Sequence, residues 1–259
     1  RNASDVSRNV NNTISPTEVT DSLGGGFRVI SSNLTVADST VSNNDAGAAS
    51  GGGIANVGYA DYSVIDSKSS LGPTFSFEDI STTGTPLALA DGSDQQVAIG
   101  FPFRSFEVTT GDVWISDDGR LYFGGSATDP SVFGFNDDLD PTTGTLYYET
   151  RGVAPNRRFI VQYQGVGFTG DSDAGSVTFQ MILYEGSNDV LMQYADVEDS
   201  DRARGSDALV GVRGGAGSLP VSGERFEYSQ RNPVLSNGLA VLFPATGDLL
   251  VTNTTIENN

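Results

Sequence analysis

The chain has 259 residues, of which 33 are acidic and 14 basic, so its formal charge is −19, and it contains no cysteine and no histidine. The lack of cysteine excludes disulfides, thiol nucleophiles and thiolate zinc sites, and the lack of histidine removes the commonest general base and metal ligand. The negative charge, without any basic run, argues against nucleic acid as a partner. No apolar stretch is long enough for a transmembrane helix, so no membrane insertion is expected.

The acidic side chains are mostly aspartate, and Lys68 is the only lysine. An aspartate-rich, lysine-poor surface suits a halophilic or calcium-rich setting, because carboxylates retain water and cations where monovalent charge is screened. A secreted protein from a lineage with biased composition would have the same signature. Both interpretations stay open at the level of composition.

An internal repeat links the two ends of the chain. Residues 33–44 align without a gap with residues 248–259, and residues 24–29 match 51–56 at a separation of 27 positions. The first pair of segments is 215 positions apart, far beyond one repeat. If residues 59–244 are an insertion of 186 residues, that separation falls to 29, close to the 27 found independently. The repeat therefore predicts two structural units, one inserted in the other.

Composition changes at the same two boundaries. Of the 24 aromatic residues, only Phe27 lies outside residues 59–244. The flanking segments consist instead of Asn, Ser, Thr, Gly and Val. We therefore expect coils at 1–58 and 245–259, with one inserted domain at 59–244.

The flanking segments have a strand-like pattern. Leu34-Thr-Val and Leu249-Leu-Val alternate with period two, as the inward-facing positions of short strands do. Stacked coils would place Leu34 beside Leu249 and Val41 beside Ile256 in one aliphatic column. A helical repeat is excluded, because apolar residues do not recur at a spacing of three or four.

The segment Asn33-Leu-Thr-Val-Ala-Asp-Ser-Thr-Val-Ser-Asn-Asn, followed by Gly51-Gly-Gly-Ile-Ala-Asn, carries a family resemblance. It resembles the right-handed parallel β-helix repeats of bacterial polymorphic outer-membrane proteins and related surface proteins. The resemblance covers the 73 flanking residues (259 − 186) and implies a short right-handed parallel β-helix. A low-complexity Ser/Asn/Gly linker is the alternative, but it leaves the twelve-residue internal match unexplained.

Residues 59–244 predict an all-β domain. Alternating aromatic and aliphatic residues mark eleven short strands, without a helical period. The expected strands are 74–77, 97–101, 113–116, 120–123, 145–148, 158–163, 177–184, 190–194, 209–213, 225–228 and 239–243. Asp118-Gly119, between two of them, predicts a two-residue hairpin turn. Together these features predict a β-sandwich or jelly-roll.

An ordered series of segments in the insert carries a second resemblance. It runs from Phe135-Asn-Asp-Asp-Leu-Asp-Pro through Asn156-Arg-Arg-Phe-Ile-Val-Gln-Tyr and Phe179-Gln-Met-Ile-Leu-Tyr-Glu-Gly to Asp189-Val-Leu-Met-Gln-Tyr. This series is similar to a β-sandwich module of large secreted bacterial and archaeal proteins, which is distantly similar to nidogen-like extracellular domains. The resemblance implies a non-catalytic domain used for adhesion or scaffolding. The expected fold is therefore all-β, a short right-handed parallel β-helix with an inserted β-sandwich or jelly-roll domain.

Asp137, Asp138 and Asp140 form a D-D-x-D cluster ahead of a Pro-Thr-Thr-Gly turn. Three carboxylates within four residues repel one another unless a cation or solvent relieves the charge, and oxygen-only ligands at this spacing suit Ca²⁺. The alternative is a solvated turn whose aspartates cap backbone amides. Calcium is the one cofactor that the sequence predicts.

A second acidic loop, 196–207, places five acidic residues around Arg202 and Arg204 and predicts ion pairs within the loop. Loops 134–144 and 196–207 are also the candidate contacts for a carbohydrate or protein ligand of the sandwich. For loop 196–207, calcium binding is the less favoured interpretation.

Enzymatic interpretations are weak. The β-helix lyases and hydrolases need clefts built from many coils, the chain has no Gly-x-Ser-x-Gly motif, and Ser-His catalysis is impossible without histidine. We therefore expect no catalytic residues. All four Asn-x-Ser/Thr sites lie in the flanking segments and are glycosylation candidates: Asn2, Asn11, Asn33 and Asn253.

The outer coils of such a β-helix would expose apolar columns. Val6 on one side, and Leu249, Val251 and Ile256 on the other, are the expected assembly residues. Through them the C-terminal coil of one copy would stack on the N-terminal coil of the next, giving a head-to-tail homopolymer in a filament or surface array. The alternative is a fragment of a large cell-surface adhesin, in which neighbouring coils of a longer chain take the place of a second copy. Both interpretations predict an extracellular, cell-surface location.

Overall fold

The computed structural model describes residues 62–245, apart from 127 and 216–224, together with seven short strands outside that range. The chain divides into two compact units, one of residues 62–245 and one of residues 1–61 with 246–259. The repeat in the sequence placed the corresponding insertion at residues 59–244.

Strands far apart in the sequence pair in parallel in the unit that joins the two ends of the chain. Its described strands form three sheets: β1 (Thr13–Ile14), β4 (Thr40–Ser42) and β21 (Thr255–Glu257); β2 (Phe27–Ile30) and β5 (Ile54–Val57); β3 (Leu34–Ala37) and β20 (Leu249–Thr252). Leu34 pairs with Leu249, and Val41 pairs with Ile256. These pairs confirm the strand register predicted from the repeat.

Two further pairings reproduce the 27-residue repeat. Thr13 pairs with Thr40 and Phe27 with Ile54, so both separations are 27 positions (40 − 13 and 54 − 27). All of the pairings described in this unit are parallel. The right-handed β-helix expected from the sequence remains an interpretation of these parallel pairs.

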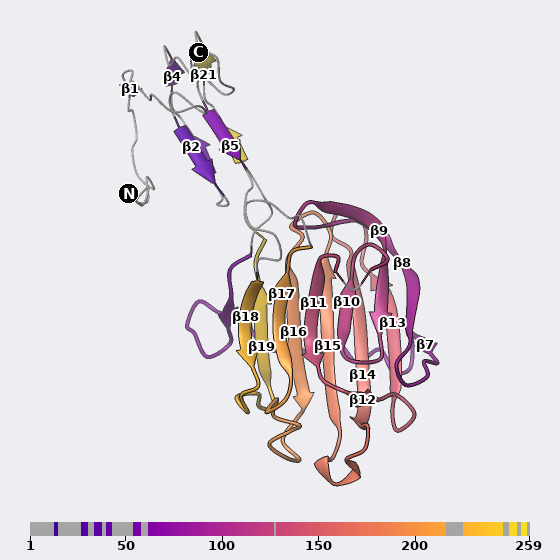
Figure 1. The fold of residues 1–259 in the computed structure, drawn as a ribbon. Helices are drawn as coiled ribbons and strands as arrows, with labels where there is room; N and C mark the ends of the chain where they lie inside the picture. Colours follow the sequence, from indigo (N-terminus) through magenta and orange to yellow (C-terminus); the bar gives the residue numbers. More distant parts are fainter. Residues whose placement is uncertain are drawn as a thin grey trace. The chain divides into compact units, whose positions relative to one another are not determined.

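The second unit is a sandwich of two antiparallel sheets (Figure 1). The strand order of the first sheet is β18 (Arg225–Gln230), β17 (Leu209–Arg213), β11 (Ser131–Asn136), β10 (Arg120–Tyr122), β9 (Val108–Ser116) and β8 (Asp94–Ser105). The order of the second sheet is β6 (Ile65–Asp66), β19 (Leu239–Phe243), β16 (Val190–Asp196), β15 (Val177–Tyr184), β14 (Arg158–Phe168), β13 (Thr145–Arg151) and β7 (Thr85–Leu87), and β12 (Leu139–Asp140) pairs with β14.

A hydrophobic core fills the space between the two sheets. Phe135 and Phe179, which come from opposite sheets, have ring centroids 5.8 Å apart, and Phe179 stacks on Tyr163 at 4.6 Å. The hydroxyl of the fully buried Tyr194 donates to the carbonyl of Gly134 over 2.6 Å, which satisfies its polar end. Each buried ring of this size contributes roughly 1.5–3 kcal/mol, so the aromatic cluster is a major stabilising element of the sandwich.

Ten of the eleven strands expected in the insert are present, and three match at both ends, at 177–184, 209–213 and 239–243. The prediction of a strand at 74–77 was wrong. The backbone of this segment bonds to side chains of the second sheet instead of to a neighbouring strand. The sequence pattern also missed β11, because its residues are buried on both faces and do not alternate.

The turn between β9 and β10 differs from the expected two-residue form. It contains three residues, Asp117, Asp118 and Gly119. Gly119 has a φ of +72°, and a Cβ atom there would lie 2.1 Å from the carbonyl oxygen of Phe135. Glycine is required at this position because both the backbone conformation and the close approach exclude a side chain.

Helical structure is scarce among the described residues. The helix found there is a single 3-10 turn, η1 (Ser172–Ala174). In this part of the chain no helix has the length and apolar character needed to cross a membrane.

Candidate functional site

The predicted calcium ligands lie just after β11 and in β12, where they have separate partners. Asp137 forms a two-bond ion pair with Arg202, with 3.0 Å from Nε to Oδ2 and 3.0 Å from Nη2 to Oδ1. Oδ1 of Asp140 accepts hydrogen bonds from the amide and the hydroxyl of Thr142, at 2.9 and 2.6 Å. Asp138 is exposed, and its amide donates to Oδ1 of Asp137.

This geometry changes the argument for calcium. Arg202 supplies the charge relief that the sequence argument assigned to a cation, and Asp140 caps its own turn. Within the described residues, no group of three or more acidic side chains is arranged to hold a metal ion. Calcium binding by Asp137, Asp138 and Asp140 gains no support from the geometry and stays a prediction.

Arg202 connects the loop 196–207 to residues outside it. Besides Asp137, its guanidinium lies 3.6 Å from Oδ2 of Asp171 and 4.6 Å from the ring centre of Phe168. The expectation that Arg202 pairs with acids of its own loop was therefore wrong. The arginine instead joins three loops at one corner of the sandwich.

Most of the other predicted site residues cannot be placed by their side chains. The glycosylation candidates and one assembly residue lie outside the described residues: Asn2, Asn11, Asn33, Asn253 and Val6. Leu249 and Val251 lie in β20 and Ile256 in β21, where only the backbone is described. Glycosylation and assembly through these residues stay predictions.

Two carboxylates of the turn between β9 and β10 accept hydrogen bonds from backbone amides of other segments. Asp117, which is 1% exposed, accepts a 2.6 Å hydrogen bond from the amide of Gly92, and Asp118 accepts one of 3.1 Å from the amide of Leu139. Burial, reinforced by the charge of Asp117, raises the pKa of Asp118 to about 6. Protonation of Asp118 near that pH relieves the repulsion between the two carboxylates.

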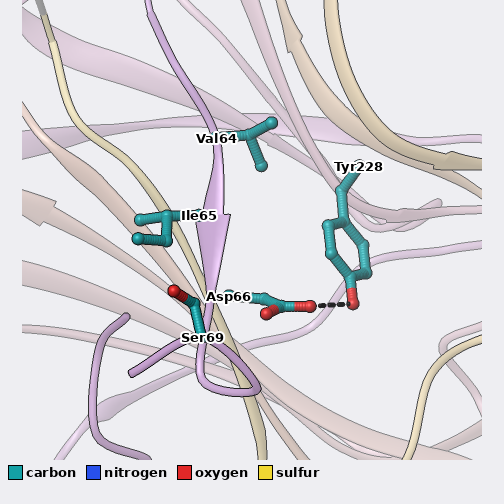
Figure 2. Close-up of a pocket in the computed structure, with 5 residues that line it drawn as sticks. All are labelled: Val64, Ile65, Asp66, Ser69 and Tyr228. Atoms are coloured by element: carbon teal, nitrogen blue, oxygen red, sulfur yellow. Dashed lines mark hydrogen bonds between the residues drawn. The ribbon is translucent and has the colours of Figure 1, made fainter. Parts of the chain in front are cut away.

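A shallow hollow of about 290 Å³ lies between an edge strand of each sheet (Figure 2). It is lined by Val64, Ile65, Asp66 and Ser69 near β6 and by Tyr228 of β18. The Tyr228 hydroxyl donates to Oδ2 of Asp66 over 2.8 Å, so these two polar side chains of the hollow already bond to each other. Its volume is at the lower limit for a small-molecule site, and the hollow defines no ligand.

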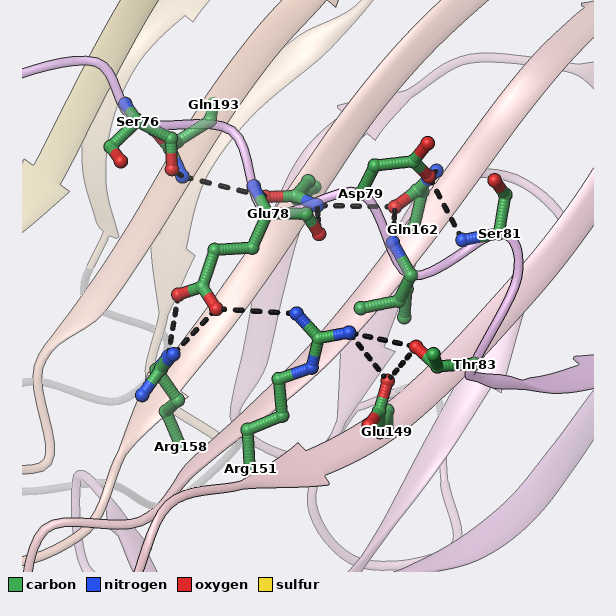
Figure 3. A network of polar contacts seen from close by, with 12 residues as sticks. Ser76, Glu78, Asp79, Ser81, Thr83, Glu149, Arg151, Arg158, Gln162 and Gln193 are labelled. Carbon is green, nitrogen blue, oxygen red and sulfur yellow. Dashed lines mark hydrogen bonds and ion pairs between the residues drawn. The ribbon is translucent and has the colours of Figure 1, made fainter.

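The outer face of the second sheet carries a ladder of three buried glutamines. Gln162, Gln180 and Gln193 are paired across β14, β15 and β16, and each is at most 1% exposed. Residues 75–80, which we call the strap, cross these three strands (Figure 3). Gln180 donates to Oε1 of Gln162 at 3.1 Å, which links the side chains of the ladder to one another.

The glutamine ladder binds the backbone of the strap. The side-chain oxygens of Gln193, Gln180 and Gln162 accept hydrogen bonds from the amides of residues 76, 78 and 80, at 2.6, 3.1 and 2.9 Å. Gln193 and Gln180 also donate to the carbonyls of residues 76 and 78, at 2.9 and 2.6 Å. Side-chain amides thus take the place of a neighbouring strand and satisfy alternate backbone groups of the strap.

Ion pairs hold the charged side of the strap (Figure 3). Glu78 accepts two hydrogen bonds from Arg158 and lies 3.5 Å from Arg151, which also pairs with Glu149 at 3.1 Å. The hydrogen bonds from Arg158 lower the pKa of Glu78. The strap is therefore fastened by a neutral ladder and by a charged cluster.

The outer face of the first sheet has a different character. One row of directly paired residues crosses all six of its strands: Gln96, Trp114, Tyr122, Ser131, Arg213 and Arg225. Leu121, Val132 and Val212, which are chain neighbours of members of this row, belong to the core cluster, so the row faces outward. Arg120 and Phe133, which pair with each other, lie on the same face.

Aromatic rings and guanidinium groups alternate along this face. The rings of Trp114 and Tyr122 are 5.8 Å apart and inclined by 8°. Arg120 lies 4.9 Å from the ring centre of Tyr122 and 5.4 Å from that of Phe133, and Arg213 covers the same Phe133 ring at 5.3 Å. We call the surface formed by Trp114, Tyr122, Arg120, Phe133, Arg213 and Arg225 the arginine–aromatic face.

Neither the ladder nor the arginine–aromatic face was predicted from the sequence. A signal for the ladder exists, because Gln162, Gln180 and Gln193 each lie within a run of buried, mostly apolar residues. A polar residue in such a strand requires a partner. No comparable signal marks the arginine–aromatic face, since its residues come from five strands that become neighbours only through the strand order of the sheet.

The fold defines a class of protein, in which an antiparallel β-sandwich is inserted into a unit of parallel strands. The family model for NIDO-related domains matches residues 69–250, and the chain belongs to this family. The match confirms the nidogen-like resemblance of the insert and indicates an extracellular-type domain. Comparison with curated proteins and with solved structures found no match.

Proposed function

We propose that the chain is a non-catalytic structural protein of the cell surface, in which a short right-handed parallel β-helix serves as a spine and carries the NIDO-related sandwich. The observation that supports this proposal most is the parallel pairing of β3 with β20, in which Leu34 lies opposite Leu249. Strands 215 positions apart join in the register of a coil repeat, as expected if the sandwich interrupts one β-helix.

The spine is proposed to assemble by adding further coils. Among the described strands, β1 and β21 each pair only with β4, so each has an outer edge that can accept a parallel strand of matching register. In a head-to-tail homopolymer that strand comes from a second copy, and the contact propagates because it is heterologous. In a larger surface protein it comes from a neighbouring coil of the same chain.

Sedimentation velocity and negative-stain electron microscopy of the purified chain test the homopolymer. We expect filaments or large oligomers at high salt, which screens the net charge of −19. The substitution Ile256→Asp should abolish assembly, because a charge in the expected apolar column opposes stacking. Thr255→Asp, at an exposed neighbouring position, adds the same charge and should assemble like the native chain.

Discrete monomers of the native chain at every concentration would overturn the homopolymer and favour neighbouring coils of a longer chain. Trp114, the only tryptophan in the chain, lies in the sandwich, so its fluorescence checks that the sandwich is folded in each variant, and far-UV circular dichroism of the full chain checks the unit that contains the substitutions. A second candidate function, adhesion through a ligand of the sandwich, is favoured by the arginine–aromatic face.

A further inference from the structure

We propose that the glutamine ladder is a binding groove for an extended segment of a partner protein, and that the strap is the groove's own occupant in the free chain. The proposal goes beyond the assembly of the spine, because it concerns only the second sheet of the sandwich. The partner segment carries a carboxylate two residues before an aliphatic side chain. The strap has this pattern itself, with Glu78 and Ile80.

The ladder contacts main-chain groups of the strap (Figure 3). Its three glutamines accept hydrogen bonds from the amides of residues 76, 78 and 80, and two of them also donate to the carbonyls of residues 76 and 78. The spacing of two residues matches the repeat of an extended chain. Because these bonds do not involve the side chains of the strap, any extended segment can form them, as when a peptide is added to a sheet.

Two further sets of contacts select the side chains of the occupant. Arg158 donates two hydrogen bonds to the carboxylate of Glu78, and Arg151 lies 3.5 Å from the same carboxylate. Ile80 is fully buried in a small apolar cluster with Ile160 and other aliphatic side chains on the outer face of the sheet. The groove therefore favours a segment with an acidic residue and an aliphatic residue at the same spacing.

The strap can open without disrupting the sandwich. Among the residues whose burial the structure describes, the main core cluster contains none from the strap, and Ile80 is the one strap residue that is buried. Exposed residues flank the strap on both sides, at 68–71 and at 82–83. A segment with few buried apolar contacts opens at a lower free energy than the whole domain.

The strap and a partner segment compete for the same contacts. A segment with the required pattern replaces the hydrogen bonds and the ion pair that the strap gives up, so the exchange leaves no buried glutamine without a partner. The strap has the advantage of its covalent link, which corresponds to an effective concentration of about millimolar. The affinity for a separate segment is therefore reduced by the small fraction of molecules in which the strap is open.

The test follows the fluorescence anisotropy of a labelled peptide with the sequence of residues 73–81, added to the intact chain. The loosened variant carries Glu78→Gln and Ile80→Ser, which remove the side-chain contacts of the strap. We expect it to bind the peptide about 10-fold more tightly than the native chain does, because its strap is open more often. Glu227→Gln, the control, removes an ion-paired glutamate from the first sheet and should bind like the native chain.

Thermal melting checks that each variant is folded. Glu78→Gln alone keeps the buried isoleucine and should give a smaller increase in affinity, so it replaces the double variant if that variant is unfolded. Failure of the peptide to bind a folded, loosened chain would overturn the proposal. A loosened chain that dimerises without peptide would assign the groove to the strap of a second copy, and would overturn it as well.

Two further changes locate the binding. A peptide that carries Glu78→Gln and Ile80→Ser should bind the loosened variant about 10-fold more weakly than the unchanged peptide. Arg158→Gln, added to the loosened variant, should weaken binding of the unchanged peptide to a similar extent, because the strap of that variant no longer forms an ion pair with Arg158. Equal binding of the two peptides, or an affinity that Arg158→Gln leaves unchanged, refutes the proposal.

Discussion

Tyr62 and Ala245 pair in an antiparallel bridge, and they are the first and last residues of the sandwich unit. The amide of Ser63 also donates to the carbonyl of Pro244 over 3.2 Å. The two ends of the inserted domain therefore meet at one place. An insertion of this form lets the flanking unit of parallel strands continue with little disturbance, because entry and exit of the chain are adjacent.

A fragment of residues 62–245 is accordingly expected to fold on its own. Among the residues whose burial the structure describes, every member of the main core cluster belongs to this unit. Circular dichroism should show a cooperative thermal transition whose midpoint lies within about 5 °C of the sandwich transition in the full chain. A fragment without a cooperative transition would show that the sandwich depends on the flanking residues.

Gln180→Leu should destabilise the sandwich strongly. The substitution leaves the amide and the carbonyl of Glu78 without their ladder partner, and each buried unsatisfied group costs roughly 1–3 kcal/mol. We expect the free energy of unfolding in urea to fall by about 3 kcal/mol. Gln230→Leu, at an exposed position, is the control and should change it by less than about 0.5 kcal/mol.

Asp118→Asn should stabilise the protein at neutral pH. The pKa of Asp118 is raised to about 6 in the folded state, so the folded chain binds the proton more tightly than the unfolded chain. The native stability therefore decreases as pH rises from about 4 to about 6. The full shift of two units corresponds to about 3 kcal/mol, which partial exposure reduces to roughly 1–2 kcal/mol.

Urea unfolding of both chains between about pH 4.5 and 7 checks this prediction. The asparagine oxygen can still accept the amide of Leu139, so the variant retains that hydrogen bond. The stability difference should widen with rising pH and then level off above about pH 7. A difference that is independent of pH would contradict the assigned titration.

Arg202→Gln should lower the stability of the protein, because Arg202 joins three loops of the sandwich. The side chains of Arg202 and Asp137 are 18% and 8% exposed, so the pair is intermediate between a surface and a buried ion pair. Removal of the arginine should cost about 2 kcal/mol, between the values for the two extremes. Arg204→Gln in the same loop is exposed and should leave the unfolding midpoint unchanged.

Much of the architecture was predictable from the sequence because the signals are local or repeat along the chain. The match between 33–44 and 248–259 fixed which residues pair in the parallel strands, and the observed register agrees. Alternation of aromatic and aliphatic residues marked strands such as 177–184. The same alternation led to a wrong prediction at 74–77. This segment lies over the second sheet and bonds to its side chains, and it is not a strand of the sheet.

The sequence by itself determined that the chain is all-β, that it contains a repeat interrupted by a second domain, and that the insert is nidogen-like, because each of these properties depends on the order and spacing of residues. The tertiary structure decided which charges meet. It paired Asp137 with Arg202, brought three glutamines into one ladder, and gathered residues of five strands into the arginine–aromatic face. These contacts depend on which strands are neighbours in a sheet, and strand order is a property of the whole fold.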